Sequence, residues 1–290
     1  GVGGGRPAPP QSTGCTGRWR SYASSAVLGV AGSRDAGAAY FIAVSTENSA
    51  PAHWRWRVEL LPQVGSTNDE LRARVEQGAA VGLVLATTDQ TAGHGRRGRA
   101  WDSPAGSGLA LSALVPMPAQ HPELVPLAAG LAAASVVNHC GVAASLKWPN
   151  DVLVDSDGKK VAGVLCRAVD TAVIIGIGIN VTMTIEQLPT DQATSLSLAG
   201  VTIDAHALVD PLLSGLRTRI DLLLEGHASQ VLAEYRRSCA TLGALVRVEL
   251  ATGTLLGRAV DVDDDGCLLV DDGERVHTIT AGDVVHVRPA

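Results

Sequence analysis

The sequence predicts an α+β protein in which a mixed β-sheet with helices is followed by a small C-terminal β-barrel. Two observations lead to this prediction. Strand candidates follow one another between residues 145 and 179 without an intervening helix, which argues against a regular strand-helix alternation. Beyond Gly243 the chain consists of short alternating segments separated by Asp- and Gly-containing turns. We expect the helices to lie on one face of the mixed sheet.

The first elements are predicted from about Trp54 onward. Residues 55–61 favour a strand, and residues 69–75 favour a helix. Thr67 and Glu70 have the spacing of a capping box, in which two side chains satisfy free backbone N–H groups at a helix start. A strand-helix unit is therefore expected directly after the first fifty or so residues.

The middle of the chain supplies the rest of the predicted sheet and its helices. Further strands are expected at residues 81–87, 109–115, 145–148, 161–167 and 172–179. A helix is expected at residues 123–140. Leucines at three- and four-residue spacing predict two more helices within residues 204–237, broken near Gly226. Residues 246–250 alternate as the first strand of the barrel.

Three regions are expected along the chain. Residues 1–53 mix Gly, Ala, Ser and Pro without periodicity, so we expect a disordered or artefactual leader without a secretion signal or helix-turn-helix pattern. Residues 54–240 are expected to form the main domain, and residues 241–290 the small barrel domain.

Composition narrows the class of protein. The net charge of -6 at pH 7 argues against a protein that coats nucleic acid. The five cysteines include no Cys-x-x-Cys pair, so we expect a reduced, cytoplasmic protein. The longest apolar tract, residues 125–145, contains Asn138 and His139 and predicts an amphipathic or buried helix rather than a membrane span. We expect no membrane anchor and no specific nucleic acid partner.

Residues 93–101 read Gly-His-Gly-Arg-Arg-Gly-Arg-Ala-Trp and place three arginines among three glycines. Glycine lets a backbone approach a charged ligand, and arginine presents planar, permanently charged donors that match phosphate oxygens. The spacing is not that of a Walker A loop. The alternatives are a mobile surface loop and a contact to nucleic acid without sequence preference.

Five segments in order resemble biotin protein ligases: Gly65-Ser66-Thr67-Asn68, residues 89–99, Lys147-Trp148-Pro149-Asn150-Asp151, Lys160-Val161-Ala162-Gly163-Val164-Leu165, and Gly176-Ile177-Gly178-Ile179-Asn180. The resemblance covers residues 58–288. It implies a class II synthetase-like catalytic domain, an SH3-like barrel, and an enzyme that makes biotinyl-5′-AMP from biotin and MgATP. The biotinyl group would then pass to one lysine of a biotin carboxyl carrier domain in a carboxylase. The resemblance favours the monofunctional type, without an N-terminal DNA-binding domain.

The resemblance also implies roles for the matched residues. The biotin site would comprise Ser66, Thr67, Asn68, Gln90, His94, Gly95, Arg96, Lys160 and Gly163. Short polar side chains can satisfy the ureido ring, which would otherwise bury unpaired donors and acceptors. Arg96, Lys160 and Lys147 would be the catalytic cations that stabilise charge as two anions approach. Nucleotide contacts would be Arg96, Arg97, Arg99, Trp101, Lys147, Asn150 and Asn180.

Some of these residues have a simpler alternative role. Thr67 could cap a helix, Lys147 could be an exposed lysine, and Trp148 could be a core residue. No carboxylate cluster fixes the Mg²⁺ ligands, so the metal site stays open, with Asp151 as one candidate ligand. His94 occupies a position where arginine is common in the family, so weaker retention of the acyl-adenylate is expected.

Other functions compete with this assignment. A lipoate or octanoate protein ligase would have a similar fold and chemistry. A biotin-responsive binding protein or repressor would use the same pocket outside the enzyme class. A pure nucleic-acid module would use Arg96, Arg97 and Arg99 additively. The chain is expected to be a monomer or homodimer.

Overall fold

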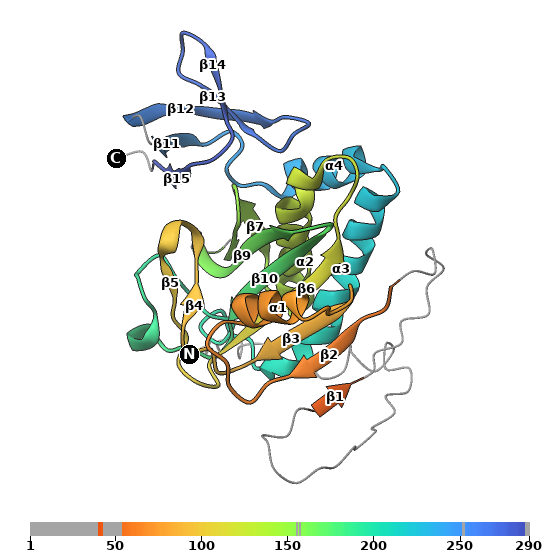
Figure 1. Cartoon of the computed structure of the whole chain (residues 1–290). Helices are drawn as coiled ribbons and strands as arrows, with labels where there is room; N and C mark the ends of the chain where they lie inside the picture. Colours follow the sequence, from red (N-terminus) through yellow and green to blue (C-terminus); the bar gives the residue numbers. More distant parts are fainter. Residues whose placement is uncertain (1–39, 43–53, 155, 157, 251–252, 288–290) are drawn as a thin grey trace, which may run out of the picture.

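The computed structural model describes residues 40–42, 54–154, 156, 158–250 and 253–287. The leader expected at residues 1–53 lies outside this part of the chain, apart from strand β1 (Tyr40–Ile42). Within the described residues the chain forms an eight-stranded sheet, a five-stranded sheet and a short two-stranded hairpin (Figure 1).

The eight-stranded sheet is mixed, as the sequence predicts. Its spatial order is β1-β2-β3-β6-β10-β9-β8-β7, and only the β2–β3 pair is parallel. The bounds of its strands after β1 are β2 (Arg57–Leu60), β3 (Leu83–Thr87), β6 (Gly108–Pro116), β7 (Ala144–Lys147), β8 (Asp151–Val154), β9 (Lys159–Val169) and β10 (Ala172–Asn180). β6, β10 and β9 are the longest strands and lie next to one another within the sheet. The candidate site described below lies against them.

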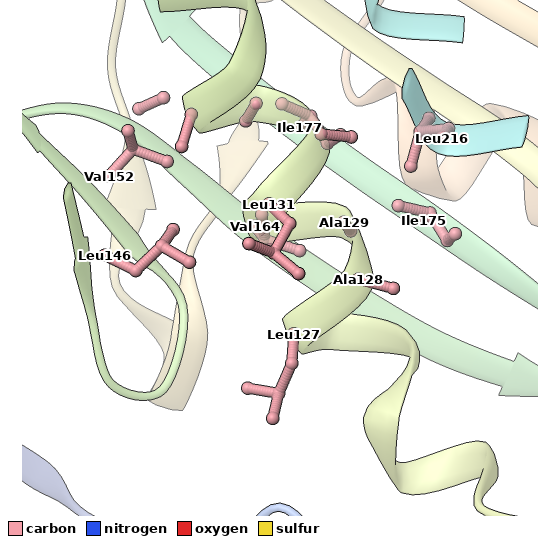
Figure 2. Close-up of a cluster of buried hydrophobic side chains, with 14 of the residues drawn as sticks. Leu127, Ala128, Ala129, Leu131, Leu146, Val152, Val164, Ile175, Ile177 and Leu216 are labelled. Carbon is pink, nitrogen blue, oxygen red and sulfur yellow. The ribbon is translucent and has the colours of Figure 1, made fainter. Parts of the chain in front are cut away.

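Three helices cover one face of this sheet. They are α2 (Val125–His139), α3 (Val209–Leu224) and α4 (Ala228–Ser238), and α2 packs against both of the others. Figure 2 shows α2 crossing the strands of the sheet, with Leu131 of the helix near Val164 of β9 in one buried cluster. The alanine-rich α2 is buried almost throughout, because small side chains let a helix approach its neighbours closely.

Helix α1 (Thr67–Glu76) covers the opposite face, so the expectation that all helices lie on one face is wrong. Leu71 of α1 packs with Leu83 and Leu85, whereas Val84 between them belongs to the core under α2. Successive residues of a strand point to opposite faces, so the two clusters lie on opposite sides of the sheet.

The start of α1 also differs from the prediction. Ser66 is the N-cap, and its hydroxyl accepts a hydrogen bond from the Asp69 N–H at 3.4 Å. Thr67 lies inside the first turn and Glu70 pairs with Arg74 at 2.8 Å, so the capping box predicted from Thr67 and Glu70 is wrong. Capping by the preceding serine leaves the Thr67 hydroxyl free to take part in the site described below.

The C-terminal region forms the predicted set of short antiparallel strands. In spatial order β14-β13-β12-β11-β15, they are β14 (Val276–Ile279), β13 (Leu268–Asp271), β12 (Gly253–Val262), β11 (Leu245–Leu250) and β15 (Asp283–His286). The Asp263 carboxylate accepts hydrogen bonds from the backbone of Asp265 and Cys267 and so forms the predicted turn between β12 and β13.

Several short elements were not predicted, and two of them help to build the site. Strand β8 follows the Pro149–Asn150 turn directly and is only four residues long. The arginine loop contains a hairpin of β4 (Gly93–His94) and β5 (Ala100–Trp101), closed by a 3₁₀ turn at Arg96–Gly98. Segments of two to four residues are too short to reveal a period in the sequence.

Among the described residues, Cys140, Cys166, Cys239 and Cys267 are free cysteines. None of the helices in the described part of the chain combines the length and the apolar character that crossing a membrane requires.

Candidate active site

A cavity of about 850 Å³ lies on the α1 side of the large sheet. That volume is within the range of pockets that bind cofactor-sized ligands. Its lining residues come from the start of α1, the arginine loop, strands β7 to β10 and strand β15. Figure 1 shows where these elements lie in the chain fold. The structure thus brings together segments that are far apart in the sequence.

Fifteen of the sixteen residues predicted for the site line this cavity: Ser66, Thr67, Asn68, Gln90, His94, Gly95, Arg96, Arg99, Trp101, Lys147, Asn150, Asp151, Lys160, Gly163 and Asn180. The exception is Arg97, which belongs to the same loop but points elsewhere.

One end of the cavity is polar but uncharged. Thr67 donates to the Gln90 side-chain oxygen from both its backbone nitrogen, at 2.9 Å, and its hydroxyl, at 3.2 Å. Asn68 Nδ2 donates to the backbone oxygen of Leu165 at 3.2 Å. Ser112 Oγ lies 2.8 Å from Thr67 Oγ1 and 2.7 Å from Asn68 Oδ1. The side chains of this end are therefore fixed before a ligand arrives.

Two glycines of β10 make room for the side chains of the cavity. A Cβ at Gly176 would lie 2.5 Å from the amide atoms of Asn68, and a Cβ at Gly178 would lie 2.4 Å from the indole of Trp101. Trp101 also lies against Gly163 of β9. The absence of side chains at these positions allows the amide and the indole to lie flat against the sheet.

The other end of the cavity is cationic. Lys160 Nζ lies 2.6 Å from Asp151 Oδ1 and 5.3 Å from the centre of the Trp101 ring. Arg96 Nη1 donates to Asn150 Oδ1 at 3.1 Å, and Asn150 in turn donates to the backbone oxygen of Val164 at 2.9 Å. Lys147 completes this set of cations.

Burial changes the proton affinity of two of these cations. Desolvation lowers the pKa of Arg96, although the charge of Asp283 acts in the opposite direction. Desolvation likewise lowers the pKa of Lys147, opposed by the charge of Asp151. Cations that are partly removed from water interact more strongly with an anion that enters the cavity.

His94 connects the arginine loop to helix α1. His94 Nε2 lies 2.8 Å from Asp69 Oδ2, and Asp69 Oδ1 lies 3.2 Å from Arg167 Nη1. The loop therefore contacts α1 and, through Asp69, strand β9.

The outer part of the same loop reaches the C-terminal sheet. Arg97 Nη1 lies 3.2 Å from Asp283 Oδ2, and Arg99 Nη2 lies 2.9 Å from Asp283 Oδ1. One carboxylate thus pairs with two arginines that the sequence assigns to the nucleotide.

Trp148 joins the two sheets as a buried residue. Its ring nitrogen donates to the Gly266 backbone oxygen at 2.9 Å, and its backbone nitrogen donates to Thr241 Oγ1 at 3.0 Å. The Thr241 hydroxyl also lies 3.0 Å from His286 Nε2. Trp148 is therefore a core residue, as the alternative role proposed, and it also connects the two sheets.

Asn180 and Asp151, predicted to read adenine and to bind metal, both have partners. The Asn180 amide nitrogen donates to the Thr194 backbone oxygen at 2.9 Å, which leaves its side-chain oxygen and its second N–H for a ligand. Asp151 pairs with Lys160. Among the described residues, the one group of three potential metal-binding side chains is His121, Glu123 and Asp265, which does not include Asp151.

Sequence reasoning missed Ser112, Asp283 and His286. Ser112 is fully buried within an otherwise apolar strand, and a lone hydroxyl in such a strand is a usable sequence signal. Asp283 and His286 line the cavity from the C-terminal sheet. No local pattern points to them, because their place depends on how the two sheets meet.

Comparisons with known proteins agree with this arrangement. The biotin/lipoate A/B protein ligase family matches residues 60–181, and the biotin protein ligase C-terminal domain matches residues 241–287. The first match contains most of the cavity residues, and the second contains Asp283 and His286.

Individual relatives extend the similarity over most of the chain. The chain is 39% identical over 248 residues to the biotin--[acetyl-CoA-carboxylase] ligase of Mycobacterium tuberculosis, covering 82% of this chain and 92% of that protein. It is 30% identical to the bifunctional ligase/repressor BirA of Bacillus subtilis, covering 76% of this chain and 71% of that protein. The solved structure of Aquifex aeolicus biotin protein ligase in complex with biotin and ATP matches with a TM-score of 0.69 and 29% identity, covering 80% of this chain and 99% of that one.

Proposed function

Because this chain belongs to the biotin/lipoate A/B protein ligase family, we propose that its cavity catalyses the ATP-dependent attachment of biotin to a protein lysine. The observation that carries the proposal is the division of one cavity into a neutral polar end and a cationic end. Biotin has the same division, since its ureido ring is neutral and polar and its carboxylate is anionic.

The neutral end suits the ureido ring. In our proposal Ser66, Thr67, Asn68 and Gln90 hydrogen-bond the ring, and Ser112 holds Thr67 and Asn68 in place. A buried ureido group needs such partners, since an unpaired buried donor or acceptor is costly. His94, Gly95 and Gly163 would complete the wall around the valeryl chain.

The cationic end suits the first chemical step. A biotin carboxylate oxygen attacks the α-phosphorus of ATP, the bond to the bridging oxygen breaks, and pyrophosphate leaves. Arg96, Lys147 and Lys160 would stabilise the negative charge that gathers as the two anions approach. Trp101 would stack on adenine, while Asn150 would keep Arg96 directed at the phosphate and Asn180 would contact the base.

Magnesium would enter as MgATP. Three carboxylates line the cavity, Asp102, Asp151 and Asp283; Asp151 pairs with Lys160, and Asp283 pairs with two arginines of the loop. Mg²⁺ in phosphoryl-transfer sites is commonly held by phosphate oxygens and water with few protein ligands, so a cavity in which Asp151 and Asp283 already pair with cations is compatible with this form.

In the second step a lysine amine of the acceptor attacks the acyl carbon of biotinyl-AMP. An amide bond forms, AMP leaves, and the amine releases a proton. The acceptor would be a biotin carboxyl carrier domain of a carboxylase. We expect the reaction to occur in the cytoplasm, where the free thiols would stay reduced, and the protein to be a monomer or homodimer.

Biotin-dependent exchange of labelled pyrophosphate into ATP tests the first step. We expect exchange with biotin and none with lipoate or octanoate, followed by biotinylation of a carrier domain when one is added. Exchange with lipoate instead would indicate a lipoate protein ligase. No exchange with any of the acids would overturn the proposal.

A further inference from the structure

The three arginines of the 93–101 loop point to two different places. Arg96 points inward, where its guanidinium donates to Asn150 at 3.1 Å. Arg97 and Arg99 point to Asp283 at the start of β15, at 3.2 and 2.9 Å. The loop therefore presents one arginine to the cavity centre and holds the neighbouring sheet with the other two.

The backbone of the loop supports this division. Arg97 has φ 55° and ψ 34°, a left-handed conformation that is uncommon for a residue with a side chain. In this conformation Arg97 Nη1 reaches Asp283 and its Nη2 lies 3.4 Å from the Glu249 backbone oxygen. Contacts to β11 and β15 thus maintain a turn that the residue alone would disfavour.

Asp283 uses one carboxylate oxygen for each arginine, and its side chain is 31% exposed. A carboxylate shared by two guanidinium groups is a small network rather than an isolated surface pair, so it restrains the loop more than either contact alone. Asp283 also lines the cavity wall beside Arg99.

We propose that Asp283 is a positioning residue that holds the arginine loop over the cavity from the C-terminal sheet, and that Arg97 and Arg99 are anchors for Asp283 rather than ligands of the nucleotide. The proposal rests on the function given above. It reassigns two of the predicted nucleotide contacts and leaves Arg96 as the arginine that meets phosphate.

The alternative predicts the opposite sign for one substitution. If Arg97 and Arg99 bound the triphosphate directly, Asp283 would compete with ATP for them. Removing its negative charge would then tighten ATP binding. If Asp283 positions the loop, removing the charge releases the loop and weakens ATP binding.

The test compares Asp283→Asn, Asp283→Glu and the matched control Glu249→Gln. Glu249 lies opposite Asp283 in the register of β11 and β15, but its side chain pairs with Arg247 and Thr254 instead of the loop. We measure KM for MgATP and kcat in biotin-dependent pyrophosphate exchange. KM should rise about fivefold in Asp283→Asn, recover largely in Asp283→Glu, and stay within about twofold in Glu249→Gln.

A double variant separates an anchor from a ligand. If Arg99 acts through Asp283, Arg99→Gln combined with Asp283→Asn should raise KM no further than the larger single effect. Additive effects, or a fall in KM in Asp283→Asn, would overturn the proposal.

Loop release can also be followed without activity. Trypsin cleaves after arginine, so we expect faster cleavage within residues 96–99 in Asp283→Asn than in the wild type, with unchanged rates in Glu249→Gln. An Arg97→Gln, Arg99→Gln double variant, which leaves the C-terminal sheet unaltered, should reproduce the KM change if Asp283→Asn fails to fold. Unchanged KM in that double variant would equally contradict the proposal.

Failure of the proposal for Asp283 can be told apart from failure of the proposed ligase function. Wild-type protein without biotin-dependent exchange would reject the ligase assignment itself. Wild-type exchange with an unaltered KM in Asp283→Asn would reject only the role of Asp283.

Discussion

At the scale of the residue, the main feature of the cavity is that hydrogen bonds within the protein hold several of its side chains in place before a ligand binds. Thr67, Asn68 and Gln90 are fixed by each other and by Ser112, and Arg96 is fixed by Asn150. Preorganised donors stabilise developing charge without having to reorient during the reaction. Substituting one of these residues at a time should therefore show what each contributes to substrate binding or to the reaction rate.

Lys160→Gln should lower kcat of biotin-dependent pyrophosphate exchange about 100-fold, since removing one fixed donor to a developing anion typically has an effect of this order. The matched control is the neighbouring Lys159→Gln, because Lys159 does not line the cavity. Equal losses in both variants would show that the charge of this strand matters in general and that Lys160 has no special role.

His94→Arg should lower the release of biotinyl-AMP about two- to fivefold. An imidazole is charged only when protonated, whereas arginine keeps its charge and offers more donors to Asp69 and to the acyl-adenylate. The measurement is biotinyl-AMP released into solution in the absence of an acceptor.

His206→Arg is the control for this change, because His206 is an exposed histidine that pairs with Asp204 at 3.2 Å outside the cavity. It should leave the release rate unaltered. An unchanged release rate in His94→Arg would remove His94 from the retention of the intermediate.

At the scale of the element, strand β10 joins the two ends of the cavity. Gly176 and Gly178 are two residues apart and face the same side of the sheet, one against Asn68 and the other against Trp101. A single strand thus supports both the neutral end and the aromatic wall of the cationic end.

Alanine at these two positions should separate the two substrates. Gly176→Ala displaces the Asn68 amide and should raise KM for biotin, while Gly178→Ala displaces Trp101 and should raise KM for ATP, each about tenfold or more. Both constants can be measured by pyrophosphate exchange. Equal changes in both constants in both variants would indicate a general distortion of β10 and contradict the division.

At the scale of the whole molecule, the cavity is completed where the two sheets meet. Trp148 donates to Gly266, and His286 lies 3.0 Å from the Thr241 hydroxyl that accepts from the Trp148 backbone. The two-domain division at residues 240 and 241 stays a prediction. These contacts nonetheless link the stability of the C-terminal sheet to the cavity.

His286 should make folding stability depend on pH. Desolvation lowers the pKa of His286 below its ordinary value of 6.5, and the charge of Lys147 acts in the same direction. As the pH falls below 6.5, the unfolded chain therefore binds a proton that the folded chain resists, and stability is lost. Above 6.5 both states are neutral and this contribution to pH dependence disappears.

Thermal unfolding between about pH 5 and 7.5 measures this effect. His286→Gln should flatten the decline of Tm on the acidic side, while the exposed His227→Gln should keep the wild-type profile. A profile in His286→Gln as steep as that of the wild type would place the acid sensitivity elsewhere.

The sequence by itself determined most element types and the α+β class, since periodicity is a local property. Its resemblance to biotin protein ligases, carried by short motifs, supplied fifteen of the residues that line the cavity. The predicted strands at 109–115 and 172–179 correspond to β6 and β10, and the helix at 123–140 corresponds to α2. Three features were predicted wrongly or not at all: the Ser66 cap, the position of α1 on the second face of the sheet, and the short strand β8. They depend on local hydrogen bonding and on packing rather than on the periodicity of apolar residues.

Only the tertiary structure decided how the arginine loop is used. Arg96, Arg97 and Arg99 are equivalent in the sequence, but the left-handed turn at Arg97 and the nearby Asp283 direct them to different partners. The same is true of Ser112, whose partners Thr67 and Asn68 belong to helix α1, and of His286, whose partner Thr241 lies between α4 and β11. Contacts between segments separated by more than a hundred residues arise from the closure of the whole chain around its core, and no local pattern encodes them.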